Sequence, residues 1–140
     1  PSLKRKTKTL AVLVLIQIIY GAFTAGLKAG FGNYIFTDIF AFPPQVSSFI
    51  NDGPTVLFIH RYLAIFILIY ALFLYLTELK NTTLQPYQKT GLQFVLGTVL
   101  LQVTLGILAL LNSVPISLGV IHQAGAVLVI TSCVYLIRRT

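Results

Sequence analysis

Four apolar stretches of membrane-spanning length dominate this chain of 140 residues. A helix needs about 20 consecutive apolar residues to cross the hydrocarbon core of a bilayer. Stretches of this length cover residues 9–28, 55–77, 90–111 and 114–137. Backbone polar groups in lipid must be satisfied within the segment, so each stretch predicts a transmembrane α-helix. The sequence therefore predicts an all-α membrane protein, an antiparallel four-helix bundle that forms one domain over residues 1–140.

The composition excludes a soluble domain. Hydrophobic residues make up 56% of the chain and charged residues only 9%, whereas soluble domains carry about 25% charged residues. Cys133 is the only cysteine, which excludes intramolecular disulfides and cysteine metal clusters. Because the chain begins at Pro1 and contains no methionine, it is expected to be processed or excised from something longer.

The basic residues are concentrated on one side of the predicted bundle. The net charge is +7, and eight of the ten basic residues precede the first stretch, separate the second from the third, or follow the fourth: Lys4, Arg5, Lys6, Lys8, Lys80, Lys89, Arg138 and Arg139. With four spans these regions share one side, and the positive-inside rule places both termini in the cytoplasm or the matrix. This placement predicts a lipid bilayer as the partner and argues against nucleic acid.

The two histidines of the chain both lie inside apolar stretches. His60 is six residues after Pro54, and His122 is seven residues after Pro115. At a rise of ~1.5 Å per residue, the two rings would lie within about 2 Å of the same depth if both helices begin at one membrane face. Ionisable residues within a membrane are costly and are functional by default. The pair predicts axial ligands on two helices for a flat metallocofactor.

The ligand count favours haem over zinc. A zinc site usually needs four protein-derived ligands, and no Asp, Glu or Cys lies at a depth to complete one with His60 and His122. A haem supplies four equatorial nitrogens, so two histidines suffice to hold its iron. Iron with histidine on both faces has no open position, which suits electron transfer rather than oxygen activation.

Small residues accompany each histidine. Ala64 and Ala126 lie one turn beyond the histidines on the same helix face, where a bulky side chain would meet a porphyrin. Gly21 and Gly106 lie on the other two helices at a similar depth, where each would let a ring edge approach the backbone. For the glycines alone, ordinary small-residue helix packing is the favoured explanation, and the paired histidines add weight to the haem interpretation.

Other polar residues near the histidines have two interpretations. Arg61 could pair with a haem propionate through its fork of donors, or simply extend to the membrane surface. Lys28 is a weaker propionate candidate. Gln17 and Gln102 are expected to form hydrogen bonds between helices. No catalytic role is assigned to any of these residues.

An internal similarity links the two halves of the chain. The first and third stretches each contain a glutamine with a glycine four residues later, and the second and fourth each contain a histidine with an alanine four residues later. This order favours a duplicated helix pair. The long connection, residues 29–54, is rich in aromatic residues and predicts either a partial lid or an interfacial aromatic belt. Its acidic residues, Asp38 and Asp52, are expected to be solvated.

Several segments resemble the C-terminal half of heme A synthase, and the resemblance covers nearly the whole chain. The similar segments are residues 21–30 with Asn33 and Phe36, residues 58–64 (Phe-Ile-His-Arg-Tyr-Leu-Ala), residues 101–107 (Leu-Gln-Val-Thr-Leu-Gly-Ile), and Val114-Pro115 leading to His122-Gln123. The resemblance implies an eight-helix parent made of two four-helix halves. It implies that this half binds haem b through His60 and His122, with the N-terminal half of the parent as its partner.

The resemblance also implies an activity for the parent protein. That protein oxidises a methyl group of heme O to a formyl group, which makes heme A for cytochrome oxidase. The family's catalytic glutamate belongs to the other half, and here Ile59 precedes His60. This segment alone is therefore expected not to be catalytic. The implied location is the bacterial plasma membrane or the mitochondrial inner membrane, and heme O synthase or cytochrome oxidase assembly factors are candidate partners.

Three alternatives remain open from the sequence. The chain could be a free-standing electron-transfer protein of the cytochrome b type with two histidine ligands. It could also be a half-size synthase that acts as a homodimer. A non-redox scaffold or transporter would require that His60 and His122 bind nothing.

Overall fold

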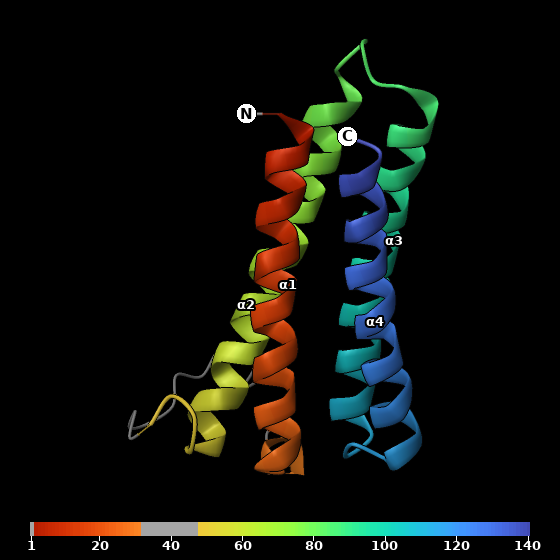
Figure 1. The fold of residues 1–140 in the computed structure, drawn as a ribbon. Helices are drawn as coiled ribbons and strands as arrows, with labels where there is room; N and C mark the ends of the chain where they lie inside the picture. The colour runs from red at the N-terminus through yellow and green to blue at the C-terminus, as the bar shows by residue number, and fades with distance from the viewer. Residues whose placement is uncertain (1, 32–47) are drawn as a thin grey trace.

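The chain folds into four long antiparallel helices (Figure 1). The computed structural model describes residues 2–31 and 48–140. The helices are α1 (Leu3–Gly26), α2 (Gly53–Leu79), α3 (Pro86–Leu111) and α4 (Ile116–Arg138), with a short 3-10 helix, η1 (Ala29–Phe31). Each of the four is long and apolar enough to cross a membrane, and the described ranges contain no strand. The predicted all-α membrane bundle is confirmed.

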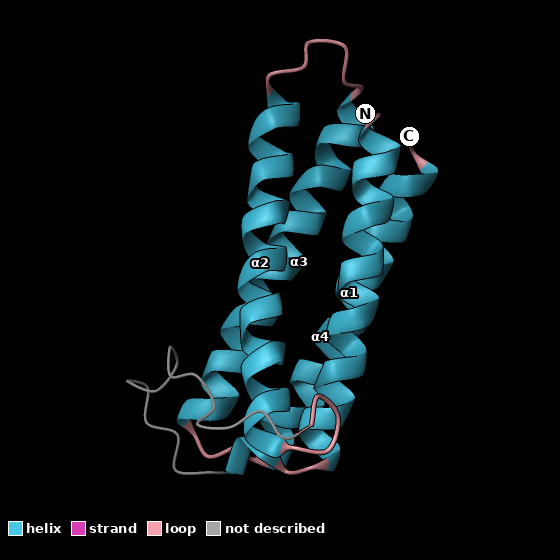
Figure 2. Cartoon of the chain, turned by 90° about the vertical axis from the view of Figure 1, so that its left-hand side faces the viewer, coloured by secondary structure: helices cyan, strands magenta, loops and turns pink. Residues whose placement is uncertain are grey.

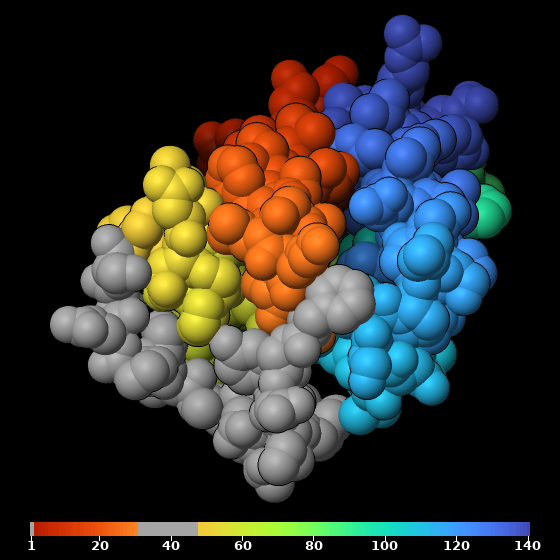
Figure 3. Space-filling model, turned by 90° about the horizontal axis from the view of Figure 1, so that it is seen from below, coloured from red at the N-terminus to blue at the C-terminus, as the bar shows by residue number. Residues whose placement is uncertain are grey.

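The two ends of the bundle differ in what they contain. The N-terminus, the C-terminus and the α2–α3 connection lie at one end, which we call the terminal end (Figure 1). The α3–α4 turn and the first turn of α2 lie at the other, which we call the opposite end. Helix α1 packs most extensively against α2, and α3 against α4; contacts of α2 with α3 and of α1 with α4 complete the bundle (Figure 2). Viewed from the opposite end, α1 lies between the start of α2 and the α3–α4 turn (Figure 3).

The helices are longer than the apolar stretches at the terminal end. Helix α1 begins at Leu3 and α3 at Pro86, whereas the stretches begin at residues 9 and 90. Lysine and arginine have good helix propensity, so the polar flanks continue the helices beyond the apolar segments. The extra turns carry the basic residues that precede the first span.

Backbone geometry makes two helices shorter at the opposite end than their apolar stretches. The first stretch runs to Lys28, but α1 ends at Gly26 because Lys28 has a left-handed φ of 51°. The fourth stretch begins at Val114, but Val114 also has a φ of 51° and belongs to the α3–α4 turn. Helix α4 therefore begins at Ile116, directly after Pro115.

The sequence predicted that Asp52 would be solvated in the long connection, but the structure shows it as the N-cap of α2. Its side chain caps α2 by accepting hydrogen bonds from the backbone N–H of Thr55, at 3.1 Å, and from the Thr55 hydroxyl. Asp38 and most of the predicted lid over residues 29–54 lie outside the described residues.

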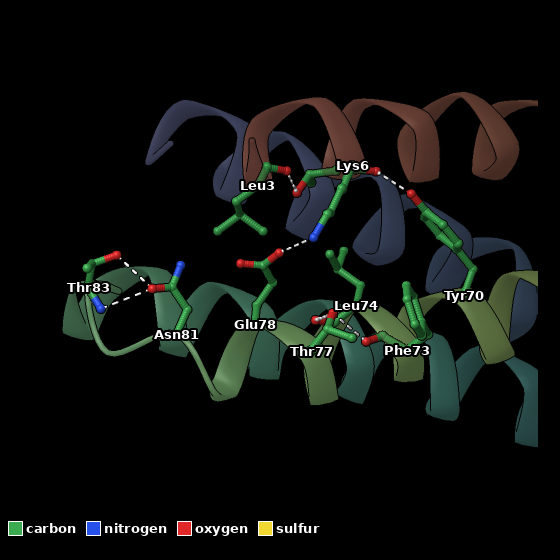
Figure 4. A network of polar contacts seen from close by, with 10 residues as sticks. Leu3, Lys6, Tyr70, Phe73, Leu74, Thr77, Glu78, Asn81 and Thr83 are labelled. Atoms are coloured by element: carbon green, nitrogen blue, oxygen red, sulfur yellow. Dashed lines mark hydrogen bonds and ion pairs between the residues drawn. The ribbon is translucent and has the colours of Figure 1, made fainter. Parts of the chain in front are cut away.

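The main hydrophobic cluster lies in the half of the bundle nearer the terminal end. Its buried members come from all four helices and the α2–α3 connection: Leu10, Ala11, Val14, Ile67, Ala71, Leu74, Leu84, Leu92, Val95, Val99, Val129, Cys133 and Leu136. A network of polar contacts lies at the terminal end of the bundle (Figure 4). The Lys6 ammonium forms an ion pair with the buried Glu78 carboxylate, and the Tyr70 hydroxyl donates to the Lys6 carbonyl at 3.3 Å.

Candidate functional site

The structure brings the two histidines together between two helices. His60 lies on α2 and His122 on α4, both half-buried and both towards the opposite end of the bundle. Their ring centroids are 6.5 Å apart, and their planes are inclined by 82°. The predicted juxtaposition of two imidazoles inside the bundle is present in the fold.

The separation of the two rings fits a single metal ion held between them. A metal–imidazole nitrogen bond is about 2.0–2.1 Å long, so two imidazoles on opposite sides of one ion have ring centroids roughly 6.4 Å apart. The observed 6.5 Å matches this spacing. The centroid separation is therefore compatible with two imidazoles that share one metal ion.

A glycine on the neighbouring helix makes room for each imidazole. A Cβ atom at Gly21 would lie 3.2 Å from Cε1 of His60, and one at Gly106 would lie 3.0 Å from Cε1 of His122. Both separations are tighter than ordinary side-chain contacts. The structure thus gives these glycines a role that the sequence did not indicate, because the histidine ring itself lies against the backbone. Admission of a porphyrin edge stays a prediction.

A glutamine one turn before each glycine contacts the same histidine. The side-chain amide nitrogen of Gln17 donates to the His60 carbonyl oxygen at 2.9 Å, and that of Gln102 donates to the His122 carbonyl oxygen at 2.8 Å. The same amide nitrogens lie 3.4 Å and 3.5 Å from Nε2 of their histidines. The expected interhelical hydrogen bonds are confirmed.

The α1–α2 pair and the α3–α4 pair therefore carry the same unit of glutamine, glycine and histidine. In both units the glutamine Oε1 and the histidine Nδ1 are buried without a hydrogen-bond partner among residues 2–31 and 48–140: Gln17, His60, Gln102 and His122. Buried polar atoms are normally paired, so unpaired ones need an explanation, such as a role in binding a ligand. The unpaired atoms cluster where the sequence places a cofactor.

The donor set fits haem better than a bare metal ion. Among residues 2–31 and 48–140, no group of three or more His, Cys, Asp or Glu side chains is placed to hold an ion. A closed zinc site is thus missing from the described part of the chain, because such sites normally take four protein ligands. Two imidazoles at the observed spacing could hold the iron of a haem, which brings its other ligands with it.

The remaining predicted site residues lie on the same helices as the histidines or near the end of α1. Ala64 and Ala126 are half-buried one turn beyond the histidines. Arg61 is half-buried next to His60 at the opposite end of the bundle, and Lys28 is exposed beyond the end of α1. Propionate binding by Arg61 and porphyrin contact by the alanines stay predictions.

Sequence reasoning missed the partner of each glutamine. Hydropathy and depth indicated an interhelical hydrogen bond, but they could not show that the acceptor would be the carbonyl of the histidine itself. The repeated spacing of Gln17 to Gly21 and of Gln102 to Gly106 was the available signal. A glutamine and a glycine one turn apart share a helix face, so the helix facing the glycine also faces the glutamine.

Comparison with known proteins places the chain in a family. The family model described as cytochrome oxidase assembly protein matches residues 1–134. Among curated proteins, the heme A synthase of Flavobacterium psychrophilum is 39% identical over 94% of this chain. The heme A synthase of Wolbachia pipientis from Culex pipiens is 35% identical over 91% of the chain, and that of Nitrosomonas eutropha is 30% identical over 98%.

The match covers only part of each relative. The chain aligns with 41%, 39% and 41% of the length of these three proteins, respectively. It therefore spans about two fifths of the curated relatives that it matches. No solved structure matches the chain significantly.

Proposed function

Since the chain belongs to the cytochrome oxidase assembly protein family, we propose that it is the haem b-binding half of a heme A synthase. In this proposal the parent protein oxidises a methyl group of heme O to a formyl group and supplies heme A to cytochrome oxidase. Four membrane-spanning helices and relatives that are bacterial heme A synthases support an integral membrane protein of this kind.

The observation that carries the proposal is the geometry of the two histidines. Two imidazoles 6.5 Å apart, each held by a glutamine and a glycine from the neighbouring helix, form a ready pair of axial ligands. We assign iron ligation to His60 and His122. A haem held in this way supplies a one-electron redox centre with no open coordination position.

The chain's own residues bind and orient the cofactor rather than perform the oxidation. No carboxylate stands beside either histidine in the described part of α2 and α4, and Ile59 and Ile121 precede the two histidines. Within the parent protein, the catalytic group is then supplied by the other half.

The proposal extends to orientation and partners. The basic residues gather at the terminal end, which we place on the cytoplasmic or matrix side of the plasma or mitochondrial inner membrane. The nearest partner is the N-terminal four-helix half of the same protein. Heme O synthase or other cytochrome oxidase assembly factors would deliver the substrate or receive the product.

Difference spectroscopy tests the cofactor assignment. We propose to purify the protein from haem-replete membranes and to record reduced-minus-oxidised spectra with His60→Ala and His122→Ala alongside. Loss of the same low-spin b-type component in both variants is expected. Gln93→Leu is the control, because Gln93 is exposed on α3, and it should leave that component unchanged. A folded, haem-loaded protein whose spectrum is identical in all four forms would refute ligation by these histidines.

A stand-alone electron carrier is the second candidate function. Two histidines at this spacing, with no carboxylate beside them among the described residues, would serve electron transfer without any oxidation of a haem methyl. Membranes that contain the parent protein with both of its halves should convert heme O to heme A if the synthase assignment is right. Intact spectra without this conversion would favour the carrier.

A further inference from the structure

Gln17 and Gln102 each lie close to both the backbone carbonyl and the ring of a histidine, so they do more than join two helices. We propose that Gln17 and Gln102 are positioning residues that fix the orientation of the His60 and His122 rings. They would hold the two imidazole planes nearly perpendicular. This inference rests on the proposed haem ligation, because ring orientation matters only when the rings bind a common metal.

The first step of the argument is the anchor to the backbone. A helical carbonyl oxygen has two lone pairs, and the helix itself uses one. The amide nitrogens of Gln17 and Gln102 donate to the His60 and His122 carbonyl oxygens at 2.9 Å and 2.8 Å. Each hydrogen bond links the neighbouring helix to the backbone of the histidine. The histidine therefore cannot move along the axis of its own helix without breaking this hydrogen bond.

The second step concerns the ring. Each amide nitrogen also lies 3.4–3.5 Å from Nε2, at the outer limit of hydrogen bonding. An amide N–H can only donate, so this contact requires the lone pair on Nε2 and the ring proton on Nδ1. A neutral imidazole nitrogen has a single lone pair, so metal binding at Nε2 would replace this contact and leave the amide beside the ring, held by its bond to the histidine carbonyl.

The third step is the opposing wall. Gly21 and Gly106 lie one turn beyond the glutamines, and a Cβ added at either would lie only 3.2 Å or 3.0 Å from Cε1 of the facing ring. Each ring is thus confined between an amide and a glycine backbone of the same neighbouring helix. Rotation of the ring towards either side meets one of them. Two such units, facing each other across the bundle, produce the 82° angle between the ring planes.

The α3–α4 unit has an additional support that makes the inference testable. Gly125 on α4 is buried, and a Cβ atom there would collide with Oε1 of Gln102. Gly125→Ala therefore displaces the Gln102 amide while leaving glutamine and histidine unchanged. Gly119 lies on the same helix with nothing within 4 Å of an added Cβ, which makes Gly119→Ala a matched control.

Electron paramagnetic resonance of the ferric protein reports ring orientation directly. Low-spin haems with perpendicular imidazole planes give highly anisotropic signals, whereas near-parallel planes give rhombic signals. We expect a highly anisotropic signal in the unmutated protein. Gln17→Met, Gln102→Met and Gly125→Ala are expected to shift it towards rhombic values and to change the reduction potential. Gln93→Met and Gly119→Ala should leave both unchanged.

The outcomes separate the inference from the function on which it rests. Absence of a low-spin haem signal in the unmutated protein refutes both. An intact low-spin signal that is unchanged in Gln17→Met, Gln102→Met and Gly125→Ala refutes the positioning role alone. A purely structural role would lower thermal stability without moving the signal of the haem that remains. If a methionine variant fails to fold, Gly125→Ala and the corresponding asparagine variants decide the question.

Discussion

At the scale of single residues, the close contact of each imidazole with a glycine is the feature on which the site depends. Gly21 and Gly106 are not required by backbone torsion, because no described glycine has a positive φ. They are required by space, since each histidine ring occupies the volume that a Cβ atom would need. Substitution of either glycine by alanine therefore tests whether haem binding depends on the position of the histidine ring.

Gly106→Ala should weaken haem retention and leave the fold intact. The added Cβ would lie 3.0 Å from Cε1 of His122, so the imidazole ring must move away by a few tenths of an ångström. Such a shift costs about 1 kcal/mol, or roughly a five-fold loss in affinity. The haem-to-protein ratio after detergent dialysis measures the effect.

Gly97→Ala is the matched control on the same helix. Nothing lies within 4 Å of a Cβ added at Gly97, so the substitution should not affect haem retention. Because alanine favours helix over glycine by about 1 kcal/mol, Gly97→Ala should if anything stabilise α3. Equal haem loss in both variants would show that the effect at Gly106 is not caused by contact with His122.

Lys6 and Glu78 form a second residue pair whose two members should respond unequally. Glu78 is the more buried partner, with 9% of its side chain exposed against 24% for Lys6. Removal of the lysine leaves a buried carboxylate without its counter-ion, whereas a freed lysine can extend to water. We expect Lys6→Met to destabilise the protein by about 1–3 kcal/mol and Glu78→Gln to destabilise it less.

Thermal unfolding in detergent measures this difference. The double variant Lys6→Met/Glu78→Gln should recover part of the loss caused by Lys6→Met, since it removes the unpaired charge. Equal losses in both single variants, with full additivity in the double variant, would contradict a role for buried charge.

At the scale of elements, the sequence predicted the helices well and their ends less well. Apolar length is sufficient to identify a membrane span, because no other backbone conformation satisfies its polar groups in lipid. Helix ends depend on local torsions instead. Lys28 and Val114 are part of apolar stretches, yet their left-handed φ values place them outside the helices.

The site was only partly predictable for a related reason. The depth of His60 and His122 follows from their position along apolar segments, and the structure confirms that they lie together. The carbonyl partners of Gln17 and Gln102 depend on how the helices rotate about their axes. Hydropathy does not fix that rotation in lipid, where all faces of a helix can be apolar.

The cap of α2 is the element-scale feature most open to test. Asp52 accepts from the Thr55 backbone N–H at the first turn, eight residues before His60. Asp52→Ala should cost about 1 kcal/mol and increase amide exchange in that turn, while Asp52→Asn should retain the cap. Hydrogen exchange measured by mass spectrometry distinguishes the two. Equal protection in both variants would show that α2 does not depend on this cap.

At the scale of the whole molecule, packing and chemistry occupy different halves of the bundle. The large hydrophobic cluster lies towards the terminal end, and the two histidines lie towards the opposite end. The terminal half therefore supplies the stability that allows the other half to contain unpaired polar atoms and small residues. A cofactor bound in that other half would supply the contacts that side chains do not.

The distribution of charge makes the final prediction one of orientation. The terminal end carries eight of the ten basic residues, and the positive-inside rule places it in the cytoplasm or matrix. Lys80, at the terminal end, and Lys28, at the opposite end, are both exposed. In a variant without other cysteines, Lys28→Cys should react with a membrane-impermeant maleimide on intact cells, whereas Lys80→Cys should react only after the membrane is opened. Cys133 is buried and should remain unlabelled when the protein that carries neither substitution is treated in the same way, which is the background control. Labelling of Lys80→Cys on intact cells would show that the orientation is the reverse of the predicted one, with the histidines near the cytoplasmic or matrix face.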